Sequence, residues 1–267
     1  MSRTLSEVFD DTRSHDRAAL IGYLPAGFPD ARRAVELITD MVAAGVDIVE
    51  VGLPYSDPLM DGPDIQAAVD QALTSGATPD VVLDTVAQVV AAGATALVMS
   101  YWNPIERYGT DRFADRMASA GGAGVITPDL TPEEAGAWIS ATDRAGLDRV
   151  FLVAPSSTDQ RIETVAAVTS GFLYAASTMG VTGTRTQVSS AAPGLVRRAR
   201  ALTDLPIAVG LGVSTGDQAS EVAAYADGVI VGSAFVRRIL RAPDHESARA
   251  GVRELAAELA EGVRRHP

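Results

Sequence analysis

The chain alternates between strand-like and helix-like patterns eight times, and this alternation restricts the fold more than any other feature of the sequence. Short apolar runs rich in β-branched residues predict strands at residues 19–24, 48–53, 97–101, 124–127, 150–153, 172–176, 206–209 and 229–231. A helical pattern follows each run, so successive strands are expected to be parallel and joined by crossover helices.

Eight such units in 267 residues predict an α/β fold of the (β/α)8 or TIM-barrel type, which usually needs about 250 residues. A doubly wound sheet commonly has about six strands and carries G-x-G-x-x-G after its first strand, a motif missing here. No linker or low-complexity segment divides the sequence. We therefore expect one barrel domain over residues 1–267 with extra helices, including two patterns at 64–74 and 80–91. Thr131-Pro132-Glu133-Glu134 predicts another helix start.

Three reactive residue types are missing or misplaced for catalysis. The chain has no cysteine and no lysine, which excludes thiolate chemistry and a lysine Schiff base, and with it ordinary pyridoxal-phosphate enzymes. Its three histidines, His15, His245 and His266, lie near the termini, so no His/Cys metal cluster is expected. General acid and base roles therefore fall to Asp, Glu and Tyr.

Charge and hydropathy limit the classes of partner that the protein can bind. The net charge is -12 and the arginines are scattered, which argues against nucleic acid. No apolar run approaches the roughly 18 residues of a membrane span. The polar first residues, MSRTLSEVFDDTRSHDR, do not have the pattern of a signal peptide. We expect a cytoplasmic protein without a membrane partner.

The stretch 47–66, D-I-V-E-V-G-L-P-Y-S-D-P-L-M-D-G-P-D-I-Q, combines two kinds of carboxylate. Glu50 lies inside an apolar strand, where an ionised group is costly unless it is paired or functional. Asp61 lies in the Pro/Gly-rich loop that follows. Each has an ordinary alternative, a solvent-facing strand end for Glu50 and a turn former for Asp61. Together they favour an acid/base pair in unlike environments.

Glycines gather in the loops after the last three strands, at 180–183, 210–212 and 232–233. At these barrel positions, backbone N–H groups and helix N-termini can hold a phosphate ester, although glycines also end strands for steric reasons. Tyr23 and Tyr174 lie within strands, where tyrosine is more often a core residue than a catalytic one. Tyr101-Trp102-Asn103 can line an aromatic pocket, and Asp129 can cap the helix expected from Thr131.

Several motifs together resemble the tryptophan synthase alpha chain family over nearly the whole chain. The most specific is E-V-G-L-P-Y-S-D-P-L-M-D-G-P-D-I-Q, and the others are Y-W-N-P-I, P-D-L-T-P-E-E, F-L-V-A-P-S-S-T-D-Q-R-I, G-V-T-G-T-R, P-I-A-V-G-L-G-V-S and A-D-G-V-I-V-G-S-A. The sequence departs from the usual pattern at Tyr55, Met60 and Thr131, where the family commonly has Phe, Ala and Pro. Those departures affect loop packing and coupling to a partner rather than a reactive group.

The resemblance implies a lyase that splits indole-3-glycerol phosphate into indole and glyceraldehyde 3-phosphate without a cofactor. It also implies a beta chain as partner, in an alpha2beta2 assembly. The beta chain receives the indole. By motif match, Glu50 and Asp61 take the catalytic positions. The remaining matches are the substrate-binding residues Tyr23, Tyr174, Thr182, Gly183, Gly212, Gly232 and Ser233.

Other functions stay open on the sequence alone. A sugar-phosphate isomerase or epimerase would use the same late loops with a different acid/base pair. A stand-alone lyase would release free indole. A chain acting chiefly as an allosteric activator of a beta subunit would not need Glu50 or Asp61.

Overall fold

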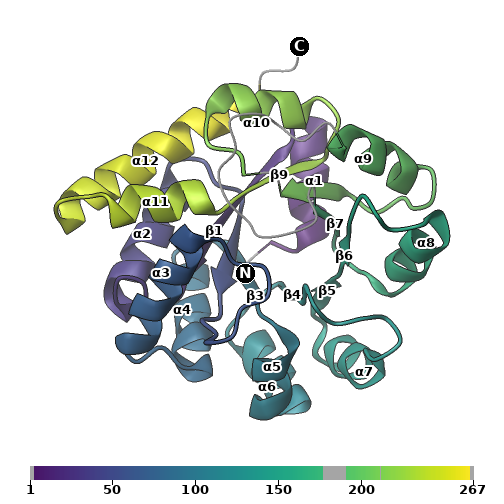
Figure 1. Cartoon of the computed structure of the whole chain (residues 1–267), viewed down its shortest axis with the longest axis horizontal. Coiled ribbons are helices and arrows are strands. Elements are labelled where there is room, and N and C mark those ends of the chain that lie inside the picture. Colours follow the sequence, from purple (N-terminus) through teal and green to yellow (C-terminus); the bar gives the residue numbers. More distant parts are fainter. Residues whose placement is uncertain (1–2, 177–190, 211, 265–267) are drawn as a thin grey trace.

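The computed structural model describes residues 3–176, 191–210 and 212–264, which form a barrel of parallel strands inside a ring of helices (Figure 1). The strands are β1 (Ala19–Pro25), β2 (Ile48–Gly52), β3 (Thr95–Met99), β4 (Gly124–Ile126), β5 (Asp148–Val150), β6 (Leu152–Val153), β7 (Leu173–Ala176), β8 (Ile207–Gly210) and β9 (Gly228–Val231). They pair in the order β5-β4-β3-β2-β1-β9-β8-β7-β6. Only Phe151 separates β5 from β6, so these are two parts of one strand, and the eight predicted barrel strands are confirmed.

The helices of the described residues comprise one that precedes β1 and others that lie after the strands. They are α1 (Leu5–Ser14), α2 (Ala31–Ala43), α3 (Pro63–Thr74), α4 (Pro79–Ala91), α5 (Trp102–Tyr108), α6 (Thr110–Ser119), α7 (Gly136–Ala145), α8 (Asp159–Val168), α9 (Ala192–Arg200), α10 (Gly216–Ala223), α11 (Ser233–Leu240) and α12 (His245–Gly262). Asp and Thr side chains cap several N-termini, as Asp30 does for α2 and Asp244 for α12. None of the described helices is long and apolar enough to cross a membrane.

The strands are apolar on both faces because each face packs into a different core. Outward side chains such as Val49 and Val98 join the large core between barrel and helices. Inward side chains such as Ile48 and Leu97 join a second core inside the barrel. Neighbouring residues on one strand therefore belong to different cores, as the two-residue period of a strand requires.

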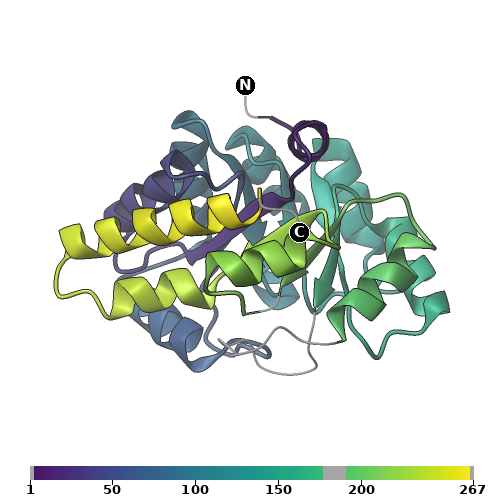
Figure 2. The ribbon, with the colours of Figure 1, turned by 90° about the horizontal axis from the view of Figure 1, so that it is seen from above.

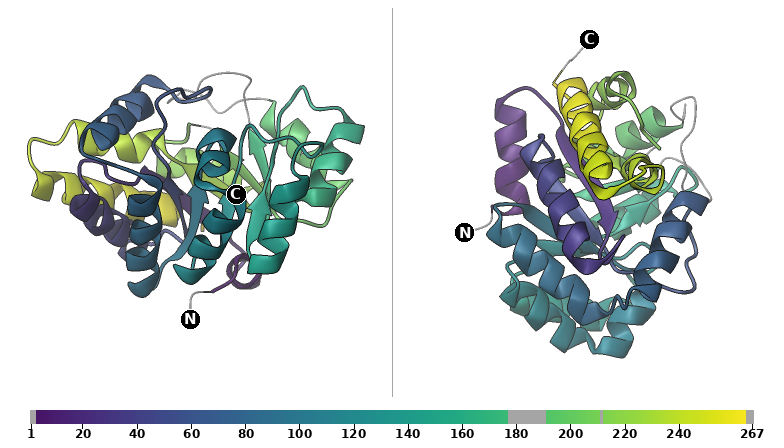
Figure 3. Two further views of the ribbon diagram at one scale, coloured as in Figure 1. Left: turned by 90° about the horizontal axis from the view of Figure 1, so that it is seen from below. Right: turned by 90° about the vertical axis from the view of Figure 1, so that its left-hand side faces the viewer.

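Helix α1, which the sequence analysis did not predict, closes one end of the barrel. Thr4 and Glu7 form a capping box at its start. The helix buries Leu5, Val8 and Phe9 in the interior core, and the Phe9 ring lies 5.7 Å from that of Phe172 between centroids. Figures 2 and 3 show α1 at the end of the barrel opposite the loop between β2 and α3. The carboxyl ends of the strands are thus the end available for chemistry.

Two local predictions for the segment after β4 were wrong. Thr131 does not start a helix, because Glu134 N–H bonds Thr131 O at 3.1 Å in a tight turn and α7 begins only at Gly136. The capping-type sequence is satisfied within that turn. Asp129 is not the cap of α7 either, since its Oδ1 accepts from Trp102 N–H at 2.9 Å and so holds the start of α5.

Candidate active site

Glu50 points into the barrel near the carboxyl end of β2. It pairs in register with Tyr23 of β1 and Leu97 of β3, and registered residues of parallel strands share one face of the sheet. The residue is only 1% exposed. Its Oε1 has no hydrogen-bond partner among the described residues. The alternative of a solvent-facing strand end is therefore wrong, and the buried carboxyl group needs another explanation.

Burial alone raises the pKa of Glu50 to about 8. The low-dielectric interior disfavours the carboxylate, and no described cation or donor offsets this cost. Near neutral pH the group is mostly protonated, yet its pKa is close enough to neutrality for the proton to leave and return. A side chain of this kind can act as an acid in one step and as a base in the next.

Asp61 lies in the loop between β2 and α3, where Tyr101 holds its side chain. The Tyr101 hydroxyl group donates to Asp61 Oδ1 at 2.9 Å and accepts from Met60 N–H at 3.0 Å. On the other side, Gln66 Nε2 of α3 donates to the carbonyl oxygen of Asp61 at 2.7 Å. Burial raises the pKa of Asp61, while the hydrogen bond from Tyr101 opposes that rise. The carboxylate is therefore both oriented and partly stabilised as an anion.

Two tyrosines occupy space that glycines on neighbouring strands leave open. A Cβ atom at Gly52 of β2 would collide with the Tyr23 hydroxyl group, and one at Gly210 of β8 would collide with that of Tyr174. Each phenol thus lies across the carboxyl end of the next strand. The sequence analysis missed the role of Gly52 and Gly210. Only the strand register shows which side chain of a neighbouring strand occupies the space beside a glycine.

Tyr23 lies close to the other ionisable residues of the site. Burial, followed by the nearby Asp61, Tyr101, Glu50 and Tyr174, raises the pKa of Tyr23 well above its usual value. The pKa of Tyr174 is likewise raised, by burial and then by Glu50. Both phenols stay neutral, and the structure brings both carboxyl groups and the aromatic side chains to one end of the barrel.

Three of the four residues expected to hold phosphate lie within the described chain. Gly212 has φ +69°, a backbone conformation that side-chain-bearing residues rarely adopt. Gly232 precedes α11 and lies against Tyr23, because a Cβ there would be 3.2 Å from Tyr23 Cδ1. Ser233 is the buried first residue of α11. Thr182 and Gly183, with the rest of the 180–183 loop, lie outside the described residues.

The histidines in the described residues lie away from this site. His245 Nε2 is 2.6 Å from Glu36 Oε2 and joins α12 to α2 on the outside of the barrel. His15 is exposed at the end of α1, and His266 lies outside the described residues. Within the part of the chain that the structure describes, no group of three or more His, Asp or Glu side chains is arranged to hold a metal ion.

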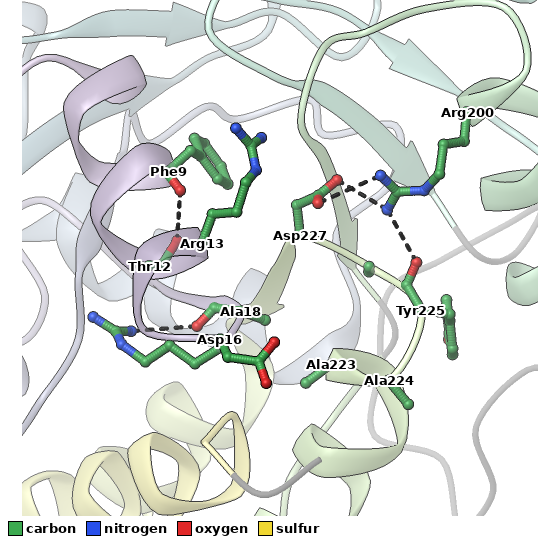
Figure 4. A pocket seen from close by; sticks show the side chains of 12 residues that line it. Phe9, Thr12, Arg13, Asp16, Ala18, Arg200, Ala223, Ala224, Tyr225 and Asp227 are labelled. Atoms are coloured by element: carbon green, nitrogen blue, oxygen red, sulfur yellow. Dashed lines mark hydrogen bonds and ion pairs between the residues drawn. The ribbon is translucent and has the colours of Figure 1, made fainter. Parts of the chain in front are cut away.

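A hollow of about 380 Å³ lies at the opposite end of the barrel, between α1 and the segment that leads into β9 (Figure 4). Two of its arginines are neutralised: Arg17 bonds both carboxylate oxygens of Asp47, and Arg200 bonds Asp227 at 3.0 Å. These pairs join segments at the amino ends of the strands. At that end of a barrel, such contacts serve stability rather than chemistry.

Comparisons with known proteins agree with this geometry. The family profile described as tryptophan synthase alpha chain matches residues 9–264. The alpha chain of Thermobifida fusca is 60% identical over 257 residues, which covers 95% of each chain. The one from Acidothermus cellulolyticus is 56% identical over 263 residues, which covers 98% of each.

Solved structures give the same result. A chain of Mycobacterium tuberculosis tryptophan synthase superposes with a TM-score of 0.92 at 51% identity, covering 99% of this chain and all of that one. The tryptophan synthase subunit alpha of Legionella pneumophila gives 0.87 at 30% identity, covering 98% of both chains. With a family match that spans almost its whole length, this chain belongs to the tryptophan synthase alpha chain family.

Proposed function

We propose that Glu50 and Asp61 carry out the alpha-chain reaction of tryptophan synthase, the cleavage of indole-3-glycerol phosphate to indole and glyceraldehyde 3-phosphate. The chain is a carbon–carbon lyase of tryptophan biosynthesis by its family. The observation that supports the assignment of Glu50 is its burial inside the barrel without a partner for Oε1, at the end where barrel enzymes bind their substrates.

The first step is the delivery of a proton from Glu50 to C3 of the indole ring. Protonation breaks the aromaticity of the five-membered ring and leaves positive charge on the ring nitrogen. Glu50 is suited to this step because its pKa of about 8 keeps it protonated near neutral pH.

The second step breaks the bond between C3 and the glycerol side chain. The Glu50 carboxylate removes the proton from the side-chain hydroxyl group, and the oxygen's electron pair forms the aldehyde. The electrons of the broken C–C bond return to the ring and neutralise its nitrogen. One proton enters at C3 and one leaves the hydroxyl group, so Glu50 ends in the state in which it began.

Asp61 stabilises the intermediate between the two steps. Its carboxylate accepts a hydrogen bond from the ring N–H, which becomes more acidic when the ring carries positive charge. Tyr101 contributes by fixing Oδ1 of this carboxylate before the substrate arrives. Because this negative charge is already in position, the site needs less rearrangement when positive charge develops on the ring.

Binding is divided between two regions of the same barrel end. Tyr23 forms a wall of the indole pocket, and Tyr174 contacts the substrate beside the two carboxyl groups. The phosphate ester is held by backbone N–H groups at Gly212, Gly232 and Ser233, with Gly183 completing the grip. Thr182 is proposed as a further substrate contact. The N-terminus of α11 adds the positive end of its dipole.

The family also implies a beta-chain partner. We propose the alpha2beta2 assembly, in which indole passes to the beta chain. We further propose that residues 1–267 form a single domain, because the helices near both ends contribute to the barrel's cores, α1 through Phe9 and α12 through Val252.

The experiment is a turnover assay of the purified chain with indole-3-glycerol phosphate, with and without a beta subunit. We expect indole and glyceraldehyde 3-phosphate in equal amounts, and faster turnover with the beta subunit. Lack of cleavage by the folded chain under both conditions would contradict the proposal. Conversion of a sugar phosphate in place of indole-3-glycerol phosphate would favour the isomerase or epimerase alternative.

A further inference from the structure

Arg237 of α11 and Asp64 of α3 form an ion pair between segments 173 residues apart in the sequence. Arg237 Nε and Nη2 both donate to Asp64 Oδ2, at 3.0 and 2.6 Å. The two side chains are 25% and 30% exposed, so the pair is partly shielded from water. Helices α3 and α11 pack against each other along this contact, as Figure 1 also shows.

Each residue of this pair lies three or four positions along the chain from a proposed substrate contact. Arg237 is four residues after Ser233, whose end of α11 faces the phosphate in the proposed function. Asp64 is three residues after Asp61. The first turn of α3 also holds the backbone of Asp61, because Gln66 Nε2 donates to the Asp61 carbonyl oxygen at 2.7 Å.

These contacts make a continuous path from the phosphate end of α11 to the catalytic loop. Helix α11 holds the start of α3 through Arg237, and the start of α3 holds the backbone of Asp61 through Gln66. Tyr101 fixes the carboxylate separately, from the β3 side. Asp61 is thus held by two contacts, and the one through α3 leads to the phosphate region.

We propose that the Arg237–Asp64 pair is a positioning contact that links occupation of the phosphate site to the placement of Asp61. This inference rests on the proposed function, since it takes Ser233 as a phosphate contact. A phosphate ester bound at the start of α11 restrains that helix, and the ion pair passes the restraint to the start of α3. The loop that carries Asp61 is then held more tightly when the phosphate ester is bound.

Arg238 provides a matched control on the same helix. Its Nη1 lies 3.9 Å from Glu254 Oε2, so it faces α12 rather than α3. Arg237→Met and Arg238→Met remove the same charge from neighbouring positions. The first removes the contact between α11 and α3, and the second leaves that contact in place.

The first measurement is hydrogen–deuterium exchange of residues 53–62 in both variants and the parent, with and without glycerol 3-phosphate. We expect the ligand to slow exchange in the parent and in Arg238→Met, and to have little effect in Arg237→Met although it still binds. If the ligand slows exchange equally in the parent and both variants, the proposed link through Arg237 is wrong, while the phosphate site still stands. If glycerol 3-phosphate does not bind the parent at all, the phosphate site in the proposed function fails, and the link fails with it.

The second measurement is a double-mutant cycle on kcat with Arg237→Met, Asp64→Asn and both together. Each single change is expected to lower kcat about fivefold, the factor that about 1 kcal/mol represents. The double variant should be no slower than the slower single variant, because both changes break one contact. Thermal unfolding of each variant checks that the fold persists. Additive losses of kcat in folded variants contradict a shared role.

Discussion

The Tyr101 hydroxyl group donates a hydrogen bond to Asp61 Oδ1 at 2.9 Å, and this contact joins the end of β3 to the loop after β2. The same oxygen accepts from Met60 N–H at 3.0 Å, so one phenol holds both the backbone and the side chain of the loop. The direction in which the carboxylate can accept from a ligand is thereby set before binding.

Replacing Tyr101 with phenylalanine should move the acidic limb of the pH profile upward. The hydrogen bond favours the anion, so its loss removes the one contribution that opposes the burial-driven rise in the pKa of Asp61. The pH at which kcat/KM falls on the acid side should rise by about one unit, the effect of a hydrogen bond to a charged group. Tyr55→Phe is the control, since its hydroxyl group bonds Asn103 Nδ2 at 2.8 Å instead. An unchanged acidic limb in Tyr101→Phe would contradict this role.

Replacing Glu50 with glutamine should stop proton transfer while keeping the shape of the side chain. We expect kcat to fall by about 10²- to 10⁴-fold, the usual contribution of an acid/base group. In the parent, kcat/KM should decline above pH about 8, as Glu50 loses the proton that it must deliver. The substrate should still bind to the variant. Single-turnover cleavage at a near-normal rate in Glu50→Gln would rule out the proposed proton carrier.

The same substitution should also change how stability depends on pH. The pKa of Glu50 is 4.5 in an exposed setting and about 8 in the fold, so between these values the folded state holds a proton that the unfolded chain has lost. The parent therefore loses stability as pH rises from 4.5 to about 8, whereas Glu50→Gln does not. Relative to pH 4, the variant should gain on the order of 3 kcal/mol over the parent by pH 7. Denaturant unfolding at several pH values measures this gap, and a constant gap would argue against the raised pKa.

Two substitutions at Asp61 separate its charge from its hydrogen bonding. Asp61→Asn keeps an oxygen acceptor but loses the negative charge, so we expect a fall in kcat of about 10²-fold or more. Asp61→Glu keeps the charge on a longer side chain and should retain more activity than Asp61→Asn. Substrate affinity should change little in either variant, because the phosphate is held elsewhere. If Asp61→Asn proves the faster enzyme in single-turnover assays, the charge argument is wrong.

A leucine at Gly212 should weaken binding of the phosphate ester. The side chain would block the backbone approach that the phosphate needs, so we expect KM to rise about tenfold or more. Gly146→Leu is a matched control, because Gly146 has φ +67° against +69° for Gly212 and lies in open space at the end of α7. Both variants carry similar backbone strain, and only one should affect KM. A normal KM in folded Gly212→Leu would remove that residue from the phosphate grip.

Local chemistry determined much of this protein before any contact was known. The eight strands were predictable because side chains apolar on both faces, such as those around Val49, are stable only in a strand buried on both sides. The proposal for Glu50 has the same basis, since an acid in such a strand must be paired or functional. Pro and Gly similarly marked the loop that carries Asp61.

Tertiary structure decided the contacts between residues that lie far apart in the sequence. Helix α1 closes the barrel through Phe9, and nothing in its own sequence shows that Phe172 is its partner. Thr131 carries a helix-start signal that a tight turn uses instead. The Asp61 carboxylate is held by Tyr101, 40 residues away, and its loop is tied through Asp64 to Arg237, 173 residues beyond. Periodicity and turn chemistry act over a few residues, whereas these contacts exist only because barrel closure brings strand ends and helix ends together.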